Sequence, residues 1–171
     1  IRDSSERLFL SFSRNSGFPV GIGLFHNIYG TVSTWDGGKV KSPAAMCRKV
    51  GYLPEEGGDI EVWGDGEQTR SFLYIDECIE ATRRLMKSDF LGPVNIGSEE
   101  MVTINQLVDT VAKVAGKDVR KIHIDGPLGV RGRNSNNDLI REKLEWDYSM
   151  TLEEGISKTY NWISEQIASK K

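Results

Sequence analysis

The feature that most constrains the fold is the alternation of two apolar periodicities along the chain. Short runs with apolar residues at every second position, such as 20–24, 60–63 and 93–96, indicate strands. Between them lie longer segments with apolar residues three and four positions apart, which indicate amphipathic helices. Strands that alternate with helices in this way predict an α/β fold with a largely parallel sheet.

Local signals predict several helix starts and one turn. Two segments fit the capping-box pattern that opens helices: Thr103 with Gln106, and Thr151 with Glu154. Ser42 is predicted to be an N-cap because Pro43, which follows it, is favoured at the first helical position. A tight turn at 65–66 predicts that strand 60–63 is followed by a returning strand at 70–75.

Composition narrows the classes of protein and partner. The 171 residues suit one domain, and the net charge of −3 with no basic tract argues against nucleic acid or an anionic membrane as partner. No apolar run approaches roughly 18 residues and no signal peptide opens the chain, which predicts a soluble, cytoplasmic protein. Cys47 and Cys78 lie in predicted helices with apolar neighbours, so we expect reduced, buried thiols and no metal site.

A loop rich in polar residues follows the strand 20–24 and is the candidate site. In open α/β sheets, ligands bind beyond the carboxyl ends of the strands, and Asn27 and Lys41 lie in such a position. The predicted helix after Pro43 would direct its N-terminus, the positive end of its dipole, toward the same region. The sequence therefore predicts a site for an anionic ligand.

Several blocks, found in the expected order, resemble the extended short-chain dehydrogenase/reductase family of NAD-dependent nucleotide-sugar epimerases and dehydratases. They are residues 25–30, 64–76, 94–98 and 144–146. Two more blocks, 34–45 and 129–137, are similar to the GDP-mannose 3,5-epimerase branch of that family. The resemblance covers the C-terminal half of such an enzyme. It implies a Rossmann-like α/β fold with a mixed sheet and flanking helices.

The resemblance also implies a division of the chain and roles for its residues. Residues 1–30 would be a remnant of the cofactor domain and 31–171 the nucleotide-sugar region, within one compact unit. Lys41 matches the proton donor of the family, and Asn27 matches an Asn that orients the sugar. The residues expected to hold the diphosphate are Arg70, Arg131 and Arg133, whose guanidinium forks fit two oxygens, with support from Lys49.

Each of these residues also has a simpler structural explanation. Lys41 and Lys49 could be solvated lysines, and Asn27 could be a turn residue. Arg70 could form a structural salt bridge, and at least one of the two arginines at 131 and 133 is expected to be only solvated. Trp63 fits a packing anchor better than a stacking platform, although it could lie under a guanine. No cofactor-binding residue is assigned.

The resemblance places the redox machinery outside this chain. The catalytic Tyr of the family would lie before Ile1, and the position of its Lys partner falls on Arg2, which stays protonated. The Gly-rich turn that holds NAD would also lie upstream. We therefore expect the chain alone to bind a GDP-mannose-like nucleotide sugar, to bind no NAD and to show no epimerase turnover.

An alternative is a stand-alone, non-catalytic module that binds a nucleotide sugar or self-associates. Strand 20–24 would present an unpaired edge, and such edges favour pairing with another chain. The predicted helix at 3–16 carries an apolar stripe of Leu8, Phe9 and Phe12. These features predict a homo-oligomer with this helix as its interface, or docking to a Rossmann half.

Overall fold

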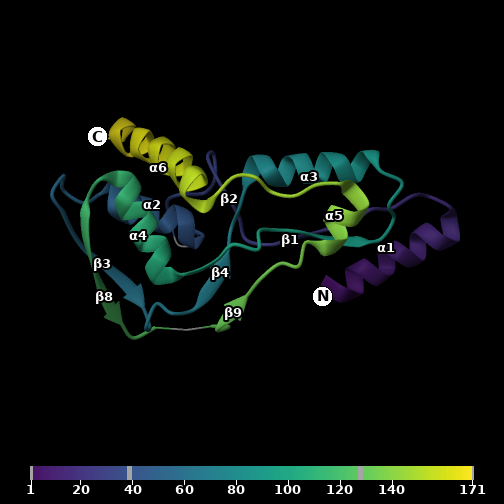
Figure 1. Cartoon of the computed structure of the whole chain (residues 1–171), viewed down its shortest axis with the longest axis horizontal. Coiled ribbons are helices and arrows are strands. Elements are labelled where there is room, and N and C mark those ends of the chain that lie inside the picture. The colour runs from purple at the N-terminus through teal and green to yellow at the C-terminus, as the bar shows by residue number, and fades with distance from the viewer. Residues whose placement is uncertain (1, 38–39, 127–128, 171) are drawn as a thin grey trace.

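The structure, a computed structural model, describes residues 2–37, 40–126 and 129–170, apart from the side chains of Arg2 and Asp3. Helices and strands alternate along the chain, as predicted (Figure 1). In chain order they are α1 (Arg2–Ser16), β1 (Ile22–Phe25), β2 (Ile28–Tyr29), α2 (Ser42–Gly51), β3 (Gly57–Trp63), β4 (Thr69–Ser71), β5 (Leu73–Tyr74), α3 (Ile75–Lys87), β6 (Pro93–Ile96), β7 (Met101–Thr103), α4 (Ile104–Ala115), β8 (Asp118–Ile124), β9 (Gly132–Arg133), α5 (Asp138–Leu144) and α6 (Leu152–Ser169).

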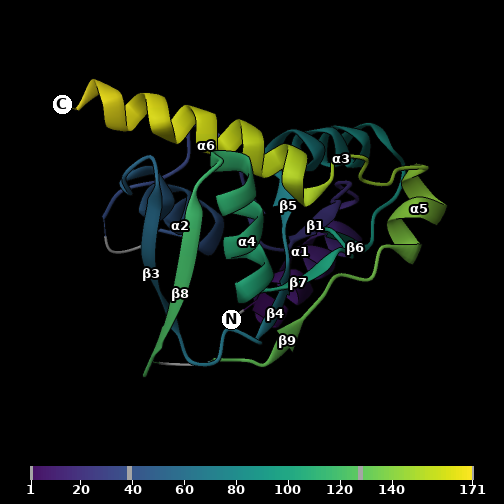
Figure 2. The ribbon, with the colours of Figure 1, turned by 60° about the vertical axis from the view of Figure 1, so that its left-hand side comes forward.

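The larger apolar core lies among α2, α4, α6 and β3. Figures 1 and 2 show α6 running across α2 and α4, with β3 and β8 side by side on the other side of these helices. Fully buried side chains from each element meet here, among them Val50, Val62, Leu107, Val111 and Ile163. This core fixes the position of α2, whose N-terminal end borders the candidate site.

The strands form small parallel and mixed sheets, and the predicted hairpin at 60–75 is wrong. β3 pairs in parallel with β8, from Gly57 opposite Asp118 to Trp63 opposite Ile124. β4 instead pairs antiparallel with β7 and parallel with β9, so the turn at 65–66 carries the chain from one sheet to another. This pairing of β4 with β7 and β9 excludes the predicted hairpin.

A second, smaller core lies between the β1–β6 pair and helices α3 and α5. β1 and β6 are parallel, with Ile22 opposite Pro93 and Phe25 opposite Ile96. The buried face of α3 consists of Cys78, Ala81 and Leu85. Two further apolar residues of α3, Ile79 and Met86, are 58% and 81% exposed.

Helix caps agree with the sequence in two of three places. Both predicted capping boxes are present, at the starts of α4 and α6. The prediction for Ser42 is wrong, because Lys41 is the N-cap of α2 and Ser42 is already helical, with no side-chain cap bond. The N-cap position places the backbone of Lys41 at the positive end of the α2 dipole.

The two cysteines are free and buried, as predicted. Burial raises the pKa of the Cys47 thiol to about 12 and also raises that of Cys78. Within the described ranges, no helix has the length and apolar character needed to cross a membrane. No cluster of potential metal ligands is found among the same residues.

Helix α1 extends away from the rest of the chain (Figure 1). Its predicted apolar stripe is present but uncovered, with Leu8 68% exposed and Phe9 and Phe12 each 54% exposed. Gly17 ends the helix in a left-handed conformation, as expected for a C-terminal glycine. An apolar helix face of this kind is typical of a surface that another chain or segment covers.

Candidate functional site

Three residues predicted for the site line one cavity. Asn27 follows β1, Lys41 precedes α2 and Arg70 lies on β4, and all three border a hollow of about 230 Å³. The parallel pairing of β2 with β5 brings the segment after β1 next to the segment after β4. The cavity is completed by Ile28, Val40, Ser42, Pro43 and Phe72.

Asn27 is both a turn residue and a cavity residue. Its φ of 40° lies in the left-handed region, which Asn tolerates better than most residues. Its side-chain nitrogen donates to the carbonyl oxygen of Ser71 at 2.9 Å, and its backbone oxygen accepts from the N–H of Leu73. Within the described part of the chain, these contacts leave its side-chain oxygen without a hydrogen bond.

A second cavity of about 530 Å³ adjoins the first and shares Val40, Ser42 and Arg70 with it. Lys49 lines this cavity, and its Nζ donates to the carbonyl oxygen of Glu61 at 2.8 Å. The remaining lining residues are Gly37, Ala45, Met46, Arg48, Glu61, Trp63, Gln68, Ile104 and Gly129. Arg70 lines both cavities, which together are called the groove below.

Arg70 is part-buried and has no acidic partner among the residues described. Its Nη1 donates to the carbonyl oxygen of the neighbouring Thr69 at 2.7 Å. The structural salt bridge considered as an alternative is therefore not found in the described part of the chain. A part-buried guanidinium group that pairs with no carboxylate in the described structure favours binding of an anion there.

The other two arginines lie outside the lining of both cavities. Arg131 is exposed and forms an ion pair with Asp65, with 3.0 Å between Nη1 and Oδ2. Arg133 lies opposite Arg70 in the register of β4 with β9, so the two arginines are neighbours on paired strands. The structure thus associates Arg133 with the groove more closely than Arg131.

Trp63 and Gln68 line the groove; the sequence favoured a packing role for Trp63 over a place under a guanine, and it did not single out Gln68. The Trp63 side chain is 56% exposed at the end of β3. Gln68 has a buried side-chain oxygen with no partner among the described residues. Trp63 ends β3 and Gln68 directly precedes β4, so their place in the groove depends on how these strands pair with distant strands.

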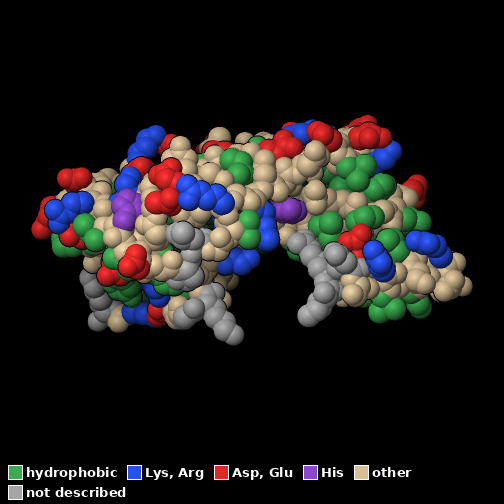
Figure 3. All heavy atoms as spheres, turned by 90° about the horizontal axis from the view of Figure 1, so that it is seen from below, with side chains coloured by type: hydrophobic (Ala, Val, Ile, Leu, Met, Phe, Trp, Pro, Cys, Tyr) green, Lys and Arg blue, Asp and Glu red, His purple; other side chains and the backbone are tan. Residues whose placement is uncertain are grey.

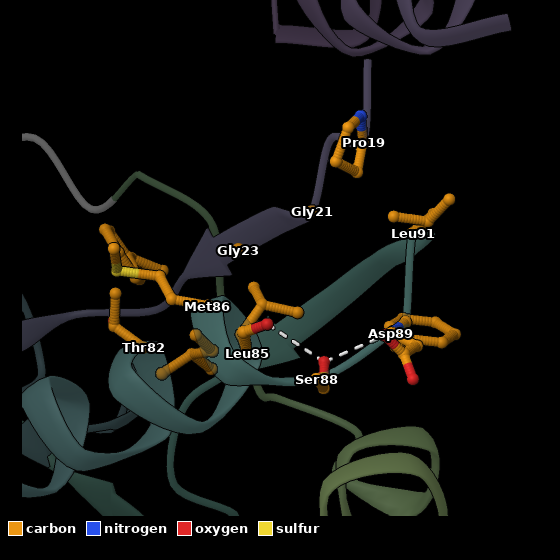
Figure 4. Close-up of a pocket in the computed structure, with 12 residues that line it drawn as sticks. Pro19, Gly21, Gly23, Thr82, Leu85, Met86, Ser88, Asp89 and Leu91 are labelled. Carbon is orange, nitrogen blue, oxygen red and sulfur yellow. Dashed lines mark hydrogen bonds between the residues drawn. The ribbon is translucent and has the colours of Figure 1, made fainter. Parts of the chain in front are cut away.

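A further cavity, of about 590 Å³, lies elsewhere and differs in character. It lies beside β1 and the C-terminal end of α3, and Figure 4 shows Gly21, Gly23, Leu85, Met86 and Leu91 around it. Its lining is mainly apolar and includes no Lys or Arg. This cavity is therefore poorly suited to a phosphorylated ligand, in contrast to the groove around Arg70.

Figure 3 shows the underside of the molecule hollowed between the part built on α2, α4 and α6 and the part that ends in α1. Lys and Arg side chains lie along the edge of this hollow. Positive side chains thus border this hollow, although the net charge of the whole chain is −3.

Comparison with known proteins finds a matching family and similar proteins. The NAD dependent epimerase/dehydratase family matches residues 4–97. The chain is 51% identical to GDP-mannose 3,5-epimerase of Arabidopsis thaliana over 98% of its own length, and 48% identical to GDP-mannose 3,5-epimerase 1 of Oryza sativa subsp. indica. It spans 44% of the length of each of these relatives.

Solved structures show the same fold. UDP-glucose 4-epimerase of Thermotoga maritima, solved with UDP-glucose, superposes with a TM-score of 0.87 at 25% identity, over 96% of this chain and 52% of that one. UDP-N-acetylglucosamine 4-epimerase of Methanobrevibacter ruminantium, at 22% identity, has a TM-score of 0.85 over the same shares. The predicted Rossmann-like α/β class with a mixed sheet is confirmed. The chain belongs to the NAD-dependent epimerase/dehydratase family.

Proposed function

We propose that this chain is the nucleotide-sugar-binding portion of a GDP-mannose 3,5-epimerase-like protein. The observation that carries the proposal is the part-buried Arg70, which joins two cavities and has no acidic partner in the described structure. A diphosphate offers two charged oxygens to such a guanidinium. The 51% identity to an Arabidopsis GDP-mannose 3,5-epimerase supports GDP-mannose as the nucleotide sugar.

The groove suggests an orientation for the ligand. The sugar would lie in the smaller cavity, where the amide of Asn27 can orient a hydroxyl and Lys41 can hold or return a proton at a carbon beside a ketone. The diphosphate would lie at Arg70, with Arg133 and Lys49 nearby. The base would lie in the larger cavity beside Trp63. NAD supplies the hydride acceptor in the family, and we assign no residue of this chain to it.

Two further proposals concern the chain as a whole. We propose that residues 1–30 correspond to the end of a cofactor domain and 31–171 to the nucleotide-sugar region. We also propose a cytoplasmic location, because free buried thiols such as Cys47 are typical of reducing compartments.

Calorimetric titration of the 171-residue chain tests the function. We expect GDP-mannose to bind, UDP-glucose to bind more weakly and NAD to give no heat of binding. NAD-dependent conversion of GDP-mannose would show that the chain is a complete catalyst. A second candidate, a stand-alone module that self-associates, is favoured by the exposed α1 face and predicts no binding of any of the three ligands.

We propose that the apolar face of α1 forms an interface with a second copy of the chain. Substitution Phe9→Glu places a charge on a side chain that is 54% exposed, so we expect it to shift an oligomer to monomer without unfolding the chain. Light scattering coupled to size-exclusion chromatography measures the mass. Ile79→Glu, at a residue 58% exposed on α3, is the control. A wild-type chain that elutes only as monomer would contradict this interface.

A further inference from the structure

Asp36 joins three separate segments at the edge of the groove. Its Oδ1 accepts from Nη1 of Arg48 on α2 at 2.9 Å and from the backbone N–H of Gly37 at 2.9 Å. Its Oδ2 accepts from Nζ of Lys170, at the end of α6, at 2.7 Å. One carboxylate thus connects the loop after β2 to two helices that are far apart in the sequence.

The neighbouring Trp35 strengthens this connection. Nζ of Lys170 lies 4.4 Å from the centre of the Trp35 ring, a cation–π distance. Trp35 also packs against the core formed by α2, α4 and α6. Hydrogen bonds from Lys170, the backbone of Gly37 and Arg48 lower the pKa of Asp36, which keeps it ionised at neutral pH.

The segment held in this way leads into the groove. Gly37 and Arg48 line the larger cavity, and Lys41 lines the smaller one. Neither Asp36 nor Lys170 lines either cavity, so a contribution of this pair to ligand binding would act through the residues that do. Exposed ion pairs contribute little to overall stability, but they can restrict a loop.

We propose that Asp36 is a positioning residue, which fixes residues 31–37 against α2 and α6 and so sets the shape of the groove at Arg48 and Lys41. The part of this inference that concerns ligand binding rests on the proposed function. The restriction of the loop itself does not depend on any ligand.

Asp36→Asn tests the proposal, with Asp59→Asn as a matched control. The two aspartates have similar side-chain exposure, 49% and 50%, and each pairs with an arginine. Arg48, the partner of Asp36, lines the larger cavity, whereas Arg120, the partner of Asp59, lines neither cavity. We expect Asp36→Asn to speed hydrogen exchange in 31–37 and to weaken GDP-mannose binding about fivefold. Asp59→Asn should change neither, and Asp36→Glu should restore part of the affinity.

Lys170→Gln provides a second test, because it removes one partner without touching the groove. It should weaken binding in the same direction, and the double variant with Asp36→Asn should bind no more weakly than Asp36→Asn alone. Unchanged exchange in 31–37, or faster exchange with unchanged affinity, would overturn the proposal. If the wild-type chain binds no GDP-mannose while exchange still responds to Asp36→Asn, the proposed function fails and the restriction of the loop stands.

Discussion

Arg70→Ala is expected to weaken GDP-mannose binding by about ten- to a hundredfold, the range for losing charge-assisted hydrogen bonds to a diphosphate. Stability should change little, because within the described structure the Arg70 side chain bonds only to the carbonyl oxygen of Thr69 and to no carboxylate. Calorimetric titration measures the affinity, and urea unfolding followed by circular dichroism measures the stability. A loss of affinity without a loss of stability would identify Arg70 as a ligand contact and not as a structural residue.

Arg131→Ala is the matched control for this experiment. Arg131 lies in the same part of the chain, but it is exposed, pairs with Asp65 and lines neither cavity. We expect less than about a twofold change in affinity, as is usual for an exposed ion pair. Equal losses in the two variants would indicate a general effect of positive charge and would contradict a specific contact at Arg70.

The candidate site was predictable where its residues belong to one continuous pattern. Asn27 and Lys41 could be placed from the strand before them and the helix after them, and the structure brings both to one cavity. The relation of Arg70 to Arg133 could not be predicted from spacing, because it depends on the pairing of β4 with β9, whose paired residues are 63 positions apart. The absence of a described acidic partner for Arg70 is likewise a three-dimensional property.

Pairing between distant strands also explains which part of the fold could not be predicted from the sequence. Capping boxes at Thr103 and Thr151 involve residues three positions apart, and both were predicted correctly. The turn at 65–66 is also local, but which strands pair on either side of it is decided by distant segments. β3 pairs in parallel with β8, although β4, β5, α3, β6, β7 and α4 lie between them in the chain.

Gly57→Ala is expected to destabilise the chain by about 3 kcal/mol or more, through this pairing of β3 with β8. Gly57 has a φ of 104°, and an added Cβ would overlap the backbone of Asp118, its partner in the register. Because the obstacle is backbone and not a movable side chain, the first pair of the ladder must separate. The urea midpoint, followed by circular dichroism, measures the loss.

Gly116→Ala distinguishes backbone conformation from steric overlap. Gly116 ends α4 with a φ of 65°, and an added Cβ there would meet no atom within 4 Å. Only the left-handed conformation opposes this substitution, so we expect a loss of about 1 kcal/mol. If the two variants were equally stable, the close approach of β8 to Gly57 would not be a constraint, and the register that positions Trp63 beside the groove would need revision.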